Sequence, residues 1–164
     1  MPRSSLTIEQ VLTTLAETPP RLAALTAGLA PAQLLAAPSP GAWSARDVLA
    51  HLCACSDMWG KYMRMIIAED RPTYRGVNPR AWIKKTDYLE QEFQPLFQAY
   101  AAQRTELLAV LQPLPPAGWT RTGTVIDMVG KQFERTVYYY AHWLAHHERP
   151  HIKQMERIVN TVRV

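Results

Sequence analysis

The sequence predicts an all-α protein, a four-helix bundle, and three observations support this. First, 164 residues suit a single domain, taken as residues 1–164. Second, the 48% hydrophobic and 20% charged composition is that of a globular chain that can bury a core without disulfides. Third, apolar residues recur at helical spacing between clusters of proline, and no alternating pattern predicts a sheet. Four long amphipathic segments with two longer connections are typical of a bundle.

The first predicted helix begins after Thr7, whose side chain suits an N-cap. Its apolar side is formed by leucines at helical spacing: Leu12, Leu15, Leu22, Leu25 and Leu29. The pair Pro19-Pro20 should kink this helix or split it, because proline lacks the backbone donor that a helix interior needs. A short turn is expected at residues 31–35.

The second predicted helix has the clearest start. Ser44 can cap it, and Asp47 follows three residues later, near the positive end of the helix. The helix is expected to run to about Glu69, since Leu52, Tyr62 and other apolar residues continue at helical spacing.

The third predicted helix covers about residues 86–111, and Pro95 indicates a kink or a later start. Residues 112–124 form a proline- and glycine-containing connection, and residues 125–130 remain ambiguous. The last helix should cover about residues 131–160, with a local kink at its one internal proline.

The net charge of +4 and the pI of about 9.2 are a mild excess of positive charge, which argues against the nucleic-acid-binding class. One basic stretch, residues 71–85, carries five cations: Arg71, Arg75, Arg80, Lys84 and Lys85. We interpret it as a solvated loop. The alternative is an anion-attracting lip over a site.

No run of about 18 apolar residues predicts a membrane span. The start of the chain lacks the apolar segment of a signal peptide. The two cysteines, Cys53 and Cys55, lie too close in one helix for an easy disulfide, which fits a reducing cytoplasm.

The histidines are the strongest candidates for a functional site. Four of the five lie within residues 142–151, and the fifth, His51, lies on the second predicted helix. At about 100° per residue, His147 and His151 share the apolar face of the last helix, and His51 lies on the apolar face of its own helix. The pair His142 and His146 falls on the polar face, which we expect to meet solvent.

Three inward imidazoles on two helices predict a site for one divalent metal ion. The alternative is a buried polar network with water. Three nitrogen ligands leave a coordination position open, as in catalytic rather than structural zinc sites. Cys55 could be a fourth ligand, although a small buried apolar side chain is the favoured interpretation. Glu148 lies about 100° off the ligand face and is not assigned as a base.

Two segments resemble known motifs of the DinB-like superfamily, in particular its DinB-2 branch. Residues 43–52, Trp-Ser-Ala-Arg-Asp-Val-Leu-Ala-His-Leu, are similar to the family's Trp-Ser-x-x-Glu-x-Leu-x-His-Leu block. Residues 144–154 resemble its Leu-Ala-x-His-(Asp/Glu)-x-x-x-His block. Asp47 stands where the family commonly has Glu. The resemblance covers nearly the whole chain.

The resemblance implies an up-down-down-up bundle, often a homodimer, with a metal held by His51, His147 and His151. Zinc, nickel or iron would suit three imidazoles. Related branches include transferases and an isomerase that use low-molecular-weight thiols, and other members have no known activity.

These considerations lead to a hypothesis of a divalent-metal-dependent enzyme whose metal lowers the pKa of a small thiol. The basic stretch 71–85 would hold the thiol's carboxylates. Five aromatic residues are candidate pocket walls, with the core as the alternative: Trp43, Trp59, Tyr62, Tyr140 and Trp143. The competing hypotheses are a metal-dependent hydrolase and a non-catalytic metal-binding stress-response module.

Overall fold

Four long helices form the body of the protein in the computed structural model, which describes residues 5–164. The predicted lack of a signal peptide concerns the start of the chain, where residues 1–4 lie outside the described residues. The bundle consists of α1 (Ile8–Thr26), α3 (Ala45–Ala68), α5 (Phe93–Leu111) and α7 (Val137–Val162). The connections contain the short helices α2 (Pro31–Leu35), α4 (Pro79–Ile83), η1 (Tyr88–Glu90) and α6 (Pro116–Trp119).

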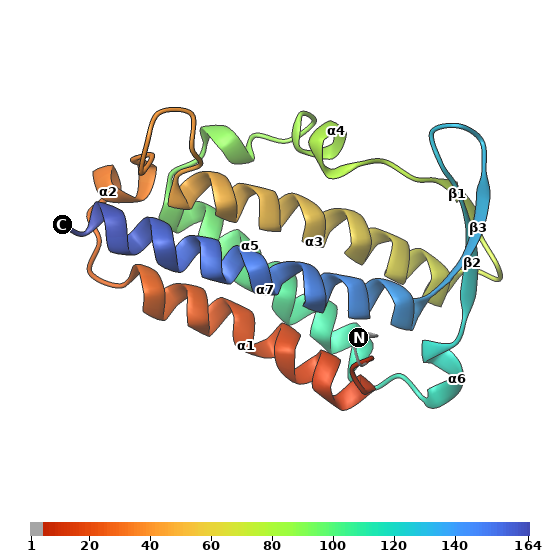
Figure 1. Ribbon diagram of the computed structural model, residues 1–164. Coiled ribbons are helices and arrows are strands. Elements are labelled where there is room, and N and C mark those ends of the chain that lie inside the picture. The colour runs from red at the N-terminus through yellow and green to blue at the C-terminus, as the bar shows by residue number, and fades with distance from the viewer. Residues whose placement is uncertain (1–4) are drawn as a thin grey trace.

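The order of directions in the bundle is up-down-down-up, which confirms the predicted fold class (Figure 1). Helices α1 and α7 run one way, and α3 and α5 run the other way. The parallel pair α3 and α5 requires a long return connection, and residues 69–92 provide it by crossing back along the bundle. Helix α3 packs mainly against α7 and α5.

The predicted helix starts at Thr7 and Ser44 are confirmed. Each side chain accepts a hydrogen bond from the backbone N–H three residues later, and each forms a capping box. The prolines do not split the helices: α1 is one continuous helix through Pro19-Pro20, and α7 continues through Pro150. Helix α5 starts late, at Phe93, because Pro95 then falls in the first turn, where no backbone donor is required.

The expectation that the chain has no sheet is wrong. Three short strands, β1 (Thr73–Arg75), β2 (Thr122–Ile126) and β3 (Gln132–Thr136), form a sheet at one end of the bundle (Figure 1). Strand β1 pairs parallel to β2, and β2 pairs antiparallel to β3. Consequently α7 begins at Val137 and not near residue 131, and Phe133 belongs to a strand.

The core of the bundle divides into two apolar clusters. One lies toward the sheet and includes Leu15, Met63 and Leu144. The other lies toward α2 and includes Leu22 and Met155. Where the clusters meet, buried polar side chains and the histidines occupy the bundle. None of the described helices is both long and apolar enough to cross a membrane.

Candidate metal centre

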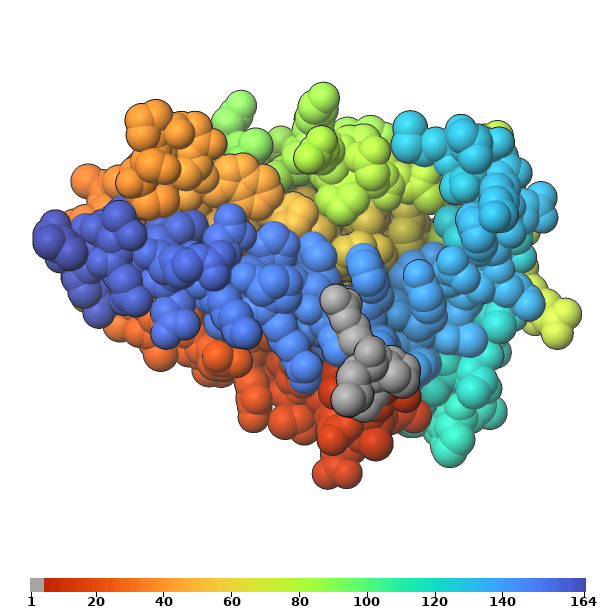
Figure 2. Space-filling view, viewed as in Figure 1, coloured from red at the N-terminus to blue at the C-terminus, as the bar shows by residue number. Residues whose placement is uncertain are grey.

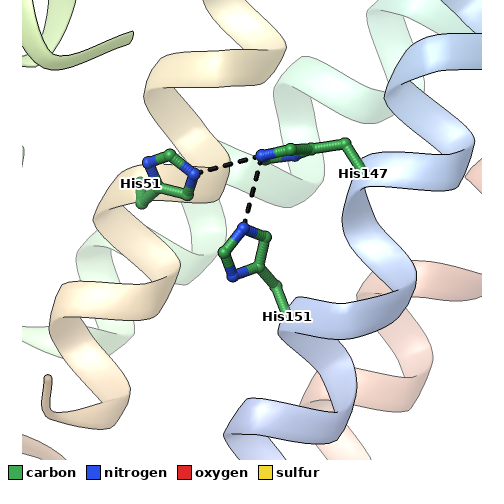
Figure 3. Close-up of side chains that lie close together, drawn as sticks. All are labelled: His51, His147 and His151. Atoms are coloured by element: carbon green, nitrogen blue, oxygen red, sulfur yellow. Dashed lines mark hydrogen bonds between the residues drawn. The ribbon is translucent and has the colours of Figure 1, made fainter.

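The imidazoles of His51, His147 and His151 converge between α3 and α7 (Figure 3). The Nε2 atom of His147 lies 3.2 Å from Nε2 of His51 and 3.3 Å from Nε2 of His151. All three side chains are half-buried. The structure therefore brings together the three histidines that the sequence selected.

Local geometry explains why these rings meet. His147 and His151 lie four residues apart on α7, so their side chains emerge one above the other on one face. Helix α3 runs antiparallel beside that face and presents His51 about two turns after its capped start. The capping box of Ser44 and Asp47 thus defines where the helix carrying His51 begins.

The spacing of the three nitrogens fits one metal ion. Imidazole nitrogens at about 2.0–2.1 Å from a tetrahedral zinc lie about 3.3–3.4 Å apart. The two distances from Nε2 of His147, 3.2 and 3.3 Å, agree with this value. The three histidines form a group whose ligand atoms all lie within 4.8 Å of one another.

The electrostatics of the cluster keep imidazoles neutral, which is the form that binds metal. Burial, followed by the nearby charge of His151, lowers the pKa of His51 from 6.5 to about 4. Burial and the charges of His151 and His51 lower the pKa of His147 to about 3. Both rings are therefore free of the competing proton at neutral pH.

A contact from Gln154 sets the tautomer of His151. The Oε1 atom of Gln154 lies 2.9 Å from Nδ1 of His151 and can only accept, so Nδ1 carries the proton and Nε2 keeps its lone pair. By contrast, the buried Nδ1 of His147 has no hydrogen-bond partner. Aromatic rings contact His51 and His147.

Tryptophans flank the histidine cluster on both sides. Trp43 stacks over His151, with an interplanar angle of 11° and ring centroids 6.5 Å apart. Trp59 meets His147 edge to face at 5.1 Å between centroids, and Trp143 lies 6.5 Å from the same ring. These contacts restrict the orientation of the imidazoles.

Cys55 lies beside the cluster but outside the group of ligand atoms. Its Sγ is 3.6 Å from Nε2 of His51 and 4.0 Å from Nε2 of His147. Burial, with the charge of Glu148, raises the pKa of the Cys55 thiol to about 12. Cys53 is also buried and free. The interpretation of Cys55 as a small buried side chain therefore agrees with the structure.

A buried ion pair that the sequence did not predict lies in the bundle core, next to the histidines. Arg104 of α5 and Glu148 of α7 are 1% and 0% exposed, and the guanidinium donates two hydrogen bonds to the carboxylate. Arg104 also donates to the backbone oxygen of Leu15 at 2.8 Å and to Oγ of Ser56 at 3.4 Å. This network joins all four long helices.

The ion pair positions the metal-site helix. Glu148 follows His147 directly, and Tyr100 also donates to its Oε1 at 2.9 Å. Because both oxygens of Glu148 are occupied, the rotation of α7 at His147 is defined by contacts on a face about 100° away from the ligands. Glu148 is not available as a base, in agreement with the sequence interpretation.

A cavity of about 280 Å³ lies one helical turn from His147, toward the sheet. Four of the five predicted wall residues line it: Trp59, Tyr62, Tyr140 and Trp143. The fifth, Trp43, lies on the other side of the histidines. Figure 2 shows this face, with α3 recessed between residues 69–92 and α7, and the β2–β3 hairpin at one end.

Of two expectations about the surroundings of the site, one is wrong and the other agrees with the structure. His142 and His146 are half-buried rather than solvated, and the Leu6 N–H donates to Nε2 of His142 at 3.3 Å. The five cations of residues 71–85 are exposed, as the solvated-loop interpretation expects, although the segment also contains β1 and α4. None of these cations lines the cavity.

Sequence reasoning missed Arg104, Gln154 and Arg135, which lines the cavity. A charged residue at position 104, among the apolar positions of α5, was a signal for the buried pair. Gln154 lies three residues after His151, a spacing at which helix side chains meet. No local signal marks Arg135, because its position depends on the unpredicted sheet.

Residues 14–155 match the sequence model of the DinB superfamily. A solved structure described as YfiT from Bacillus subtilis, a probable metal-dependent hydrolase with an unusual four-helix bundle topology, superposes with a TM-score of 0.70. The two chains are 21% identical, and the match covers 96% of this chain and 91% of that one. This likeness shows the fold. No curated protein matches at a significant level.

Proposed function

Since the chain belongs to the DinB superfamily, and three imidazoles converge with metal-ligand spacing, we propose that it is a divalent-metal-dependent hydrolase. The observation that carries the proposal is the pair of Nε2 distances, 3.2 and 3.3 Å, around His147. The similar fold of a protein described as a probable metal-dependent hydrolase supports the same reaction class.

In this proposal His51, His147 and His151 hold the ion through Nε2. An ion held by three nitrogens keeps a position for a further ligand, and it supplies Lewis acidity that activates water and polarises a carbonyl or phosphoryl oxygen. Gln154 keeps the Nδ1 proton on His151, and the Glu148–Arg104 pair holds α7 in register. Trp43 and Trp143, which are 43% and 45% exposed, border the approach to the site.

The thiol-dependent reaction is the second expectation from the sequence, and it required the basic stretch 71–85 to bind the thiol's carboxylates. Because the five cations are exposed and none lines the cavity beside the histidines, we place hydrolysis first. A non-catalytic metal module would share the three ligands, so activity must be measured separately from metal content.

The test is elemental analysis of protein purified without a histidine tag. We expect one divalent ion per chain, lost in His51→Ala and His147→Ala and retained in His142→Ala, a control on the same helix as His147. Equal metal content in all four proteins would overturn the assignment of the metal site.

The second test measures activity. Hydrolysis of an activated aryl ester should stop on chelation and return when the metal is added back. A site that holds metal without such activity on a broad ester and amide panel would overturn the hydrolase assignment.

A further inference from the structure

The cavity beside the histidines has walls of an unusual kind for a bundle surface. Five aromatic side chains line it, contributed by α3 and α7: Trp59, Tyr62, Tyr139, Tyr140 and Trp143. Trp143 and Tyr139 are 45% and 41% exposed, so the cavity is open to solvent rather than sealed in the core. Flat aromatic walls around a volume of about 280 Å³ suit a small flat apolar group.

The cavity shares a wall with the metal centre. The ring of Trp59 contacts His147 and also meets the ring of Trp143 edge to face, with centroids 6.0 Å apart. Trp143 and His147 are four residues apart on α7, a rise of about 6 Å. A ligand with its reactive bond at the histidines therefore places a group one turn away inside the cavity.

One positive charge in the cavity wall lacks an acidic partner. Arg135 of β3 stacks over Tyr139, with its guanidinium carbon 4.4 Å from the ring centroid, and forms none of the ion pairs found among residues 5–164. The acid of the same cavity, Asp127, is engaged in the hairpin turn, because its Oδ1 accepts from the N–H groups of Val129 and Lys131. Within the described part of the chain, Arg135 is therefore the one cationic side chain in the lining of the cavity.

From this juxtaposition we infer that the cavity binds the apolar part of the substrate, a flat ring system bearing an anionic group that pairs with Arg135. The inference rests on the proposed function for the position of the reactive bond, and on the cavity alone for binding. In this proposal the β2–β3 hairpin contributes to substrate specificity, and the helices of the bundle bind the metal.

The experiment is calorimetric titration with two probes that share one ring, 2-naphthoate and uncharged 2-naphthylmethanol. Arg135→Gln should weaken naphthoate binding about tenfold and leave naphthylmethanol unchanged, because it removes one charge-assisted contact. Arg75→Gln, an exposed arginine of the same sheet outside the cavity, is the matched control and should change neither. Trp143→Ala should weaken both probes, whereas the similarly exposed Trp43→Ala should not.

The inference is overturned if neither probe binds the wild-type protein, or if Arg135→Gln and Arg75→Gln give the same affinities. Equal losses in Trp43→Ala and Trp143→Ala would also overturn it, since binding would then lie elsewhere. Each titration is repeated after removal of metal, and naphthoate binding should persist. Probe binding without any metal binding would overturn only the proposed function. Metal binding without probe binding would overturn only the inference that the cavity binds a ligand.

Discussion

Gln154 accepts a hydrogen bond from the ring of His151, with Nδ1 and Oε1 2.9 Å apart. This contact holds the proton on Nδ1, so the lone pair of Nε2 points at the other two histidines. Among the described residues, His151 is the one of the three ligands whose tautomer is set by a side-chain oxygen acceptor.

Gln154→Ala should therefore weaken metal binding by about 10- to 100-fold, as expected for loss of a contact that orients a ligand. Competition with a chromophoric chelator measures the affinity. Gln154→Glu retains an acceptor oxygen and should stay close to the wild-type affinity. If the alanine variant also binds like the wild type, the contact does not orient His151.

The buried pair of Arg104 and Glu148 should be necessary for stability. Arg104→Met leaves the Glu148 carboxylate buried without its partner and should lower the free energy of unfolding by about 3–5 kcal/mol. Denaturant titration measures this change. Arg64→Met, which removes the exposed 4.0 Å pair with Glu106, is the control and should change stability by about 0–1 kcal/mol. Similar losses in both variants would contradict the assigned role.

The stability of the metal-free protein should fall as the pH decreases from 6.5 toward 4. The unfolded chain binds protons on His51 and His147 near the ordinary pKa of 6.5, whereas the folded protein binds them only near about 4 and about 3. Protons therefore favour the unfolded state in this window, and the penalty is complete below the folded pKa values. His147→Asn should reduce the slope of unfolding free energy against pH. An unchanged slope would contradict the lowered pKa.

Gly123 of β2 should not tolerate a side chain. A Cβ there would lie 2.9 Å from Cε1 of Tyr74 and 3.2 Å from the backbone oxygen of Pro72. Gly123→Ala should destabilise the protein by about 1–3 kcal/mol through overpacking. Gly60→Ala is the matched control: no atom lies within 4 Å of its Cβ, and alanine in α3 should add about 0.5–1 kcal/mol of stability. Thermal melting of both variants measures the difference.

The helices could be predicted because their signals are local. Capping at Thr7 and Ser44 depends on residues three positions apart, and the inward faces follow from a period of 3.6 residues. The same periodicity selected His51, His147 and His151, since a ring on the apolar face of a bundle helix must point at its neighbours. Proline was a weaker guide to where a helix ends, because Pro19, Pro20 and Pro150 all lie within continuous helices.

The sheet could not be predicted in the same way. Strand β1 has three residues, and its partner β2 begins 49 residues later, from Thr73 to Thr122. A strand this short has too few positions to display alternation. Its pairing is decided only when α3 and the connection after α5 end at the same side of the bundle.

By itself, the sequence determined the bundle, its capped helix starts and the three histidines that face inward, because each depends on spacing within one helix. Only the tertiary structure decided that Arg104 meets Glu148, that Gln154 rather than an acid orients His151, and that Arg135 faces an aromatic cavity. These relations join segments far apart in the chain or depend on rotamers set by packing, so residue spacing can suggest a contact but does not select the partner. The histidines thus came from local periodicity, and their surroundings came from packing.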